Sequence, residues 1–143
     1  MSFNELNTVE YQVVHRMSGL DLNTGVQATE PGQGYGIEWC YKSPEDLGRS
    51  DESKVLLLDE LRSKIDQLNP LLEGDVHKID QVIYELNSIL INVHHQGLVR
   101  SNEKFLQWLT GEKTMPLGEN GKHISIHLID FENPAKNAYT ITN

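Results

Sequence analysis

The stretch DVHKIDQVIYELNSILINV, residues 75–93, carries the clearest periodic pattern in the chain. Its apolar residues recur in alternating steps of three and four, the period of an amphipathic α-helix with one buried face. Those residues are Val76, Ile79, Ile83, Leu86, Leu90 and Val93. Asp75 is placed to cap the start of this helix, because a carboxylate can accept the backbone N–H groups of a first turn. Gly97 is expected to end it.

A second apolar stripe lies upstream of the first. It consists of Val55, Leu58, Leu61, Ile65 and Leu68, again at helical spacing. Pro70 and Gly74 interrupt the pattern between the two stripes, and the connection is short. We therefore expect the two helices to form an antiparallel hairpin.

Downstream of the hairpin, Ser101 is expected to cap a third, short helix that ends at Gly111. The helix carries Phe105 and Trp108, whose spacing predicts core positions, although aromatic side chains can also stack on nucleic-acid bases. Residues 52–110 are therefore predicted to be mainly helical.

The last part of the chain has the two-residue period of β-strands. Apolar and polar residues alternate from Ile124 to Leu128, which predicts a strand with one buried face. Gly118–Lys122 predicts a turn and not a phosphate-binding loop, because a strand follows it where a helix would be needed. Residues 114–143 are predicted to be mainly β. The sequence stops inside an expected strand at Tyr139–Thr142, and we interpret this as a truncated chain.

At the other end, a short helix is predicted from Asn7 to Ser18, with Asn7 as its N-cap and Gly19 as its stop. Its apolar stripe is Leu6, Val9, Val13, Met17 and Leu20. Glycines and prolines between Asp21 and Asp51 predict a loop with one strand at Ile37–Tyr41. The fold class is thus α+β, with a helical hairpin, short helices and a small, partly antiparallel sheet in a single domain over residues 1–143.

The composition of the chain argues against DNA wrapping, internal disulfides and membrane insertion. The chain has 143 residues and a net charge of −9. Affinity for a phosphate backbone comes mostly from Lys and Arg, so this segment is not expected to wrap DNA by itself. The single cysteine, Cys40, cannot form an internal disulfide, and there is no signal peptide and no apolar run long enough for a membrane span. We expect a cytoplasmic protein that does not insert in a membrane.

Glu10 is the one carboxylate that we single out. It borders the apolar stripe of the first helix, and a carboxylate near a buried face needs a partner. One interpretation is an oxygen ligand for a divalent metal. The other is a capping-box glutamate that bonds the backbone of Asn7, and spacing alone favours the cap.

Two further sequence patterns do not predict a functional site. Glu52-Ser53-Lys54 has the Glu-x-Lys spacing of nuclease signatures, but the upstream residues are polar, whereas such a motif ends a buried apolar strand. We interpret it as a helix start. The six histidines do not combine with cysteines or carboxylates into a zinc ligand set.

Several stretches together resemble the N-terminal region of the restriction (R) subunit of type I restriction–modification enzymes. They are Phe3–Tyr11, Asn102–Pro116, Gly118–His123, His127–Phe131 and Asn137–Asn143. The resemblance covers the start of the chain and nearly everything from Val76 to the end, whereas residues 22–73 match poorly. It implies an R subunit that begins with a PD-(D/E)xK-type nuclease domain, followed by ATP-driven translocase domains.

The resemblance also implies cofactors, partners and a site. Such a subunit joins methyltransferase and specificity subunits, moves double-stranded DNA with ATP and cuts it with Mg²⁺. Glu10 matches the acid that the first helix supplies, so it is the expected catalytic and metal-binding residue. The Asp and Glu-x-Lys elements are expected after Asn143, so this piece is expected to be inactive alone and to bind neither cofactor.

An alternative interpretation gives the chain no catalytic role. The hairpin Val55–Val93 would be an interaction module that docks the R subunit on its methyltransferase and specificity partners. Packing in the core would explain the same apolar stripes. Arg62 and Glu85, which are expected to be exposed, are the better positions at which to test it.

Overall fold

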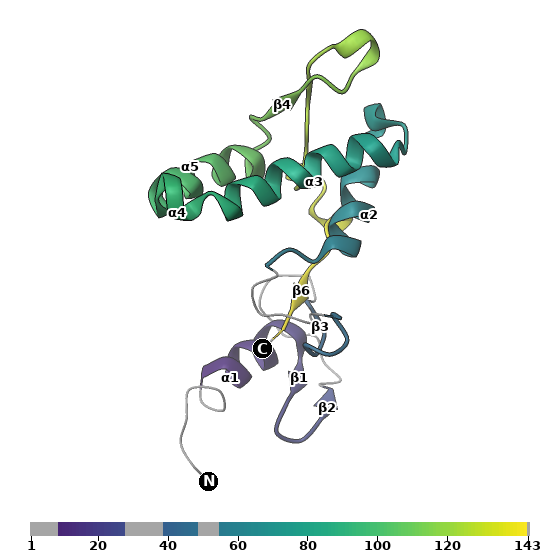
Figure 1. The fold of residues 1–143 in the computed structure, drawn as a ribbon. Coiled ribbons are helices and arrows are strands. Elements are labelled where there is room, and N and C mark those ends of the chain that lie inside the picture. The colour runs from purple at the N-terminus through teal and green to yellow at the C-terminus, as the bar shows by residue number, and fades with distance from the viewer. Residues whose placement is uncertain (1–8, 28–38, 49–54, 143) are drawn as a thin grey trace. The chain divides into compact units, whose positions relative to one another are not determined.

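The computed structural model describes residues 9–27, 39–48 and 55–142. Contacts divide the chain into two compact units (Figure 1). Unit 1 is Met1–Val55 with Ala138–Asn143, and unit 2 is Leu56–Asn137. Within the described residues, helices and three two-stranded ladders, two antiparallel and one parallel, confirm the α+β class. The single domain over residues 1–143 stays a prediction.

The helices of unit 2 follow the predicted order. They are α2 (Leu58–Leu68), the 3₁₀ turn η2 (Pro70–Leu72), α3 (Val76–Ile91), α4 (Val93–Gln96) and α5 (Leu98–Leu109). Asp75 caps α3 as predicted, because its Oδ1 accepts the backbone N–H groups of His77 at 2.9 Å and Lys78 at 3.4 Å. α2 contacts α3, where Arg62 pairs with Asp80.

Two helix boundaries differ from the prediction. The long helix α3 ends at Ile91 and not at Gly97. The short helix α4 lies between Ile91 and Gly97. Ser101 is not an N-cap: α5 begins at Leu98, and the amide of Ser101 already donates to the carbonyl of Gly97 at 3.2 Å. Ser101 is therefore a buried residue inside the helix.

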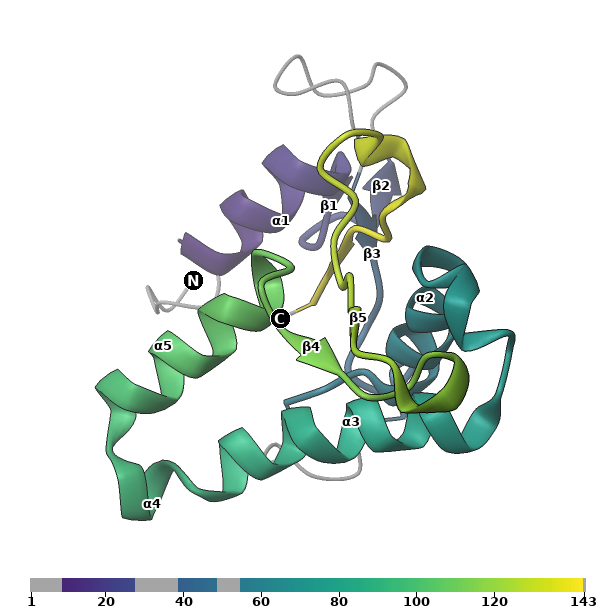
Figure 2. The same cartoon turned by 90° about the horizontal axis from the view of Figure 1, so that it is seen from above.

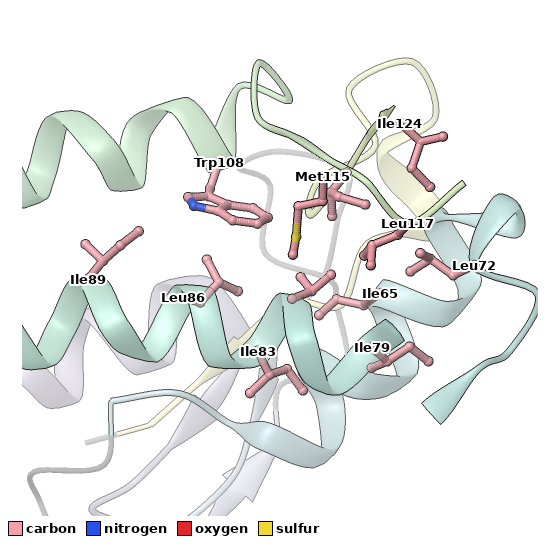
Figure 3. Close-up of a cluster of buried hydrophobic side chains, with 12 residues drawn as sticks. Ile65, Leu72, Ile79, Ile83, Leu86, Ile89, Trp108, Met115, Leu117 and Ile124 are labelled. Carbon is pink, nitrogen blue, oxygen red and sulfur yellow. The ribbon is translucent and has the colours of Figure 1, made fainter. Parts of the chain in front are cut away.

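The core of unit 2 is one apolar cluster between these helices and a β-hairpin (Figure 3). Trp108 projects from α5 toward Leu86 and Ile89 of α3, and Met115 lies beside it. The cluster is Ile65, Leu72, Ile79, Val82, Ile83, Leu86, Ile89, Trp108, Met115, Leu117, Ile124 and Ile126. Phe105 packs against it, so both predicted aromatic core positions are confirmed. The outer members of the predicted stripes, Val55, Leu58 and Val76, are exposed.

The β-hairpin joins β4 (Thr114–Met115) to β5 (Ile124–Ser125) in antiparallel register. A 3₁₀ turn, η3 (Glu119–Gly121), lies in the connection, as the glycines predict. Ile124 and Ile126 are buried, while Ser125 and His127 are exposed. The predicted alternation is confirmed, although the ladder is shorter than the alternating stretch.

Unit 1 is built from both ends of the chain. It contains α1 (Tyr11–Ser18), β1 (Leu20–Asp21), β2 (Val26–Gln27), β3 (Cys40–Tyr41) and β6 (Thr140–Ile141). β1 and β2 form an antiparallel pair that the sequence did not predict. β3 pairs with β6 in parallel, so the predicted strands at both positions are confirmed where they are described. Residues 37–38 lie outside the described residues.

α1 presents a different face from the predicted one. Gly19 ends it in the left-handed conformation with φ 75°, as predicted. Val9 and Val13 of the predicted stripe are exposed, whereas Val14 and Ser18 are buried. The predicted N-cap, Asn7, lies outside the described residues.

Candidate functional site

Glu10 stands at the N-cap position of α1 and is exposed. Its backbone is already helical, with φ −60° and ψ −46°, and its side chain makes no capping hydrogen bond. Glu10 is nevertheless four residues before Val14 and eight before Ser18, so its position lies on the helix face that those two residues bury. A capping box would need Asn7, which is outside the described residues.

The helix that carries Glu10 is fixed against the parallel strand pair. α1 contacts β1, β3 and β6 within unit 1. The amide of Trp39 donates to the carbonyl of Met17 at 3.2 Å, which ties α1 to the residue before β3. The rings of Trp39 and Tyr139 meet edge to face with their centroids 5.3 Å apart. The hydrogen bond between Trp39 and Met17 and the contacts of α1 with β1, β3 and β6 therefore hold the position of α1, and with it the position of Glu10.

Acidic and phenolic groups lie near Tyr41 of β3. Burial raises the pKa of Tyr41 above its ordinary value of 10.0, and the charges of Glu45, Tyr11 and Asp46 act in the same direction. Tyr11, the residue after Glu10, is therefore one of the groups that raise the pKa of Tyr41 in β3. Asp46 is held in a turn, because the Ser43 hydroxyl donates to its Oδ2 at 2.8 Å. Such a group of oxygens attracts cations and does not by itself attract phosphate.

The described residues do not complete a Mg²⁺ site. Mg²⁺ requires near-octahedral oxygen coordination, usually with one or two carboxylates together with water and substrate phosphates. Within residues 9–27, 39–48 and 55–142, no group of three His, Cys, Asp or Glu side chains could hold a metal ion. Glu52–Lys54 lies outside this part of the chain. Glu10 is thus at most one member of a larger ligand set.

Residues 30–143 match the protein family described as type I restriction enzyme R protein N terminus. The chain belongs to this family. Neither the curated proteins nor the solved structures gave a match to this R protein N-terminal chain. Among the described helices, none is long and apolar enough to cross a bilayer.

The range of the match refines the resemblance drawn from short motifs. It confirms the R protein assignment and includes residues 30–73, which those motifs matched poorly. Conversely, it leaves out Phe3–Tyr11, so the family assignment carries no statement about Glu10. The role of Glu10 in the R protein N terminus stays a prediction.

Proposed function

We propose that this chain is the first part of a DNA-cleaving R protein and that Glu10 supplies one acid to its Mg²⁺-dependent nuclease site. The observation that carries the proposal is the family match over residues 30–143. In the complete protein, ATP-driven movement along double-stranded DNA and association with methyltransferase and specificity subunits would belong to other regions. A cytoplasmic location follows from this role.

Two features of the chain support this assignment of roles. The described residues offer Glu10 but no complete set of metal ligands, so the remaining acids and the lysine would come from outside the described residues. The net charge of −9 is unfavourable for binding DNA alone, so basic surface from other regions would hold the substrate. Here Glu10 would contribute a fixed negative charge at the start of α1, next to the β3–β6 pair.

The proposal is tested in the full-length R protein assembled with its partner subunits. Glu10→Gln keeps the shape of the side chain and removes its charge. We expect DNA cutting to fall at least about 100-fold, more than the loss of an outer-shell partner causes, while ATP hydrolysis is retained. Gln12→Ala, at an exposed position on the same helix, is the matched control. Unchanged cutting by Glu10→Gln would remove Glu10 from the site.

The alternative function, a docking module in the hairpin Val55–Val93, gains no support from the apolar stripes. Ile65, Ile79 and Ile83 bury their side chains in the core of unit 2, so packing explains the periodicity. Arg62 is a poor probe of docking because it already pairs with Asp80. Glu85 is exposed, as expected, and remains a suitable position for a charge-reversal test.

A further inference from the structure

Asn120 and Gly121 form the only Asn-Gly pair in the sequence, and both are exposed. They lie in the connection between β4 and β5, which Figure 2 shows as a light-green loop. Asparagine is a thermolabile residue. When glycine follows it, the glycine nitrogen can attack the side-chain carbonyl carbon, because the glycine has no side chain to obstruct the approach. Asn120 is therefore the asparagine with the most reactive neighbour in the chain.

The surroundings of Gly121 leave room for this reaction. Gly121 has φ 75°, and nothing lies within 4 Å of the place where a Cβ would stand. Asn120 is also in the left-handed region, with φ 54° and ψ 31°. Two successive positive φ angles are the geometry of a type I′ turn, for which Asn-Gly is a favoured pair. The two residues that suit the turn are thus also the reactive pair, and both are open to the water that hydrolysis needs.

Hydrogen bonds of the turn oppose the reaction. The Gly121 nitrogen must lose its proton to become a nucleophile, but its N–H donates to the carbonyl of Gly118 at 3.1 Å. The amide of Lys122 donates to the carbonyl of Glu119 at 3.1 Å, and the amide of Gly118 donates to the carbonyl of Lys122 at 2.9 Å. The reaction therefore requires the turn to open first. The free energy of this local opening sets how much slower the reaction is than in an unfolded peptide.

We propose that Asn120 is a site of spontaneous covalent modification, at which cyclisation onto Gly121 is restrained by the closed turn. In the first step a bond forms between the Gly121 nitrogen and Cγ of Asn120, and the bond from Cγ to Nδ2 breaks. Ammonia leaves, carrying the proton of the Gly121 amide. In the second step water opens the five-membered imide at either of its carbonyl groups, which gives aspartate or isoaspartate. Water is the only co-reactant.

Isoaspartate changes a hairpin that carries core residues. It places one additional methylene group in the backbone between the two residues of the pair, within a turn that three hydrogen bonds close. β4 and β5 contribute Met115 and Ile124, which face each other in the ladder, to the core of unit 2. A longer connection no longer fits these bonds, so the modification lowers the stability of the hairpin and of the core that it covers.

The test follows conversion of Asn120 in the 143-residue chain at mildly alkaline pH, by mass spectrometry of its peptides. We expect conversion at least about fivefold slower than in a synthetic peptide of residues 116–124, the factor that one net hydrogen bond supplies. Gly121→Ala should slow conversion further, because its methyl group obstructs the attack. In urea, which opens the turn, the rate in the chain should approach the rate in the peptide.

Asn87 is the internal control. The small residue Ser88 follows it, but both lie within α3, where the helix holds the backbone. We expect no conversion at Asn87 in the folded chain and measurable conversion in urea. Asn120→Asp introduces the new charge without lengthening the backbone. Its free energy of unfolding should therefore be higher than that of the chain converted to isoaspartate.

Three outcomes would overturn the inference. They are an unchanged Asn120 after the peptide has reacted completely, conversion as fast in the folded chain as in the peptide, and a rate that Gly121→Ala leaves unaltered. Equal stability of Asn120→Asp and the isoaspartate form would remove the effect on the hairpin. None of these outcomes depends on the nuclease proposal, which Glu10→Gln tests separately in the full-length protein.

Discussion

Asn69 and the backbone of His127 exchange two hydrogen bonds. Oδ1 of Asn69 accepts the amide of His127 at 2.7 Å, and Nδ2 donates to the carbonyl of His127 at 2.8 Å. Nδ2 also donates to the carbonyl of Ile65 at 2.8 Å. Asn69 is 4% exposed. Its side-chain amide pairs with the backbone of His127 as a neighbouring strand would, and it joins the end of α2 to the chain just after β5.

Replacing Asn69 should be costly for the stability of the chain. Asn69→Ala leaves the amide and carbonyl of His127 without these partners in a partly buried place, so we expect the free energy of unfolding to fall by about 2–4 kcal/mol. Urea denaturation measures this loss. Asn102→Ala, at an exposed position in α5, should stay within about 0.5 kcal/mol of the unaltered chain. A loss below about 1 kcal/mol for Asn69→Ala would show that this link is not important.

Two glycines of the β4–β5 connection should respond differently to substitution. A Cβ at Gly118 would lie 2.8 Å from the carbonyl oxygen of Lys122 and 2.9 Å from Cγ2 of Ile124, so Gly118→Ala should cost about 1–3 kcal/mol through a clash. Gly121 has φ 75° and open space, so Gly121→Ala should cost about 1 kcal/mol through backbone strain alone.

Asparagine separates the two causes, because it tolerates the left-handed conformation. In thermal unfolding, Gly121→Asn should recover most of the stability that Gly121→Ala loses. Gly118→Asn should be at least as unstable as Gly118→Ala. Equal behaviour of the two positions would contradict this explanation.

The cap of α3 should have a measurable effect on stability. Asp75→Ala removes the acceptor for the amides of His77 and Lys78, and we expect a loss of about 1 kcal/mol. Asp75→Ser keeps a capping oxygen and should lose much less. Urea denaturation of the two variants makes the comparison, and equal losses would mean that the cap hydrogen bonds contribute nothing.

The raised pKa of Tyr41 predicts a loss of stability in alkali. Because the phenol ionises first in the unfolded chain, stability should fall as the pH rises from about 10, the usual tyrosine value, through the higher native pKa. Tyr41→Phe removes this part of the pH dependence. Glu45→Gln should lower the pKa of Tyr41 toward 10.0, since it removes a nearby negative charge.

NMR titration of the tyrosine rings checks the Tyr41 prediction directly. Free tyrosine in the same buffer serves as the reference. Tyr41 should ionise at a higher pH than this reference, whose ordinary pKa is 10.0. Ionisation of Tyr41 at or below the pH of the reference would contradict the environment described for β3.

The sequence predicts the long helices well because their pattern repeats over several turns. In α3 the period identifies Ile79, Ile83 and Leu86 as buried, and the cap at Asp75 is local chemistry. Ser101 shows where local rules fail. A serine favours an N-cap position. However, the left-handed backbone of Gly97, with φ 83°, separates α4 from α5, so α5 begins at Leu98 and Ser101 lies inside it.

Unit 1 could be predicted only in part. Val13 and Val14 are adjacent and equally apolar, so the pattern could not tell which of them faces inward. Ladders of two residues are too short to show a period, which is why the β1–β2 pair was missed. The surroundings of Glu10 depend on pairing between Cys40 and Thr140. These residues are far apart in the sequence, and no local sequence pattern predicts their contact.

That long-range pairing has a consequence for the order in which the molecule is made. As the ribosome releases the chain, Cys40 and Tyr41 emerge long before Thr140 and Ile141, with which they pair. The whole of Leu56–Asn137 is synthesised in between, and every core residue that the structure describes in this cluster belongs to that range. The helical unit can thus gain its structure during translation, while the unit that carries Glu10 is completed only when residues 138–143 arrive.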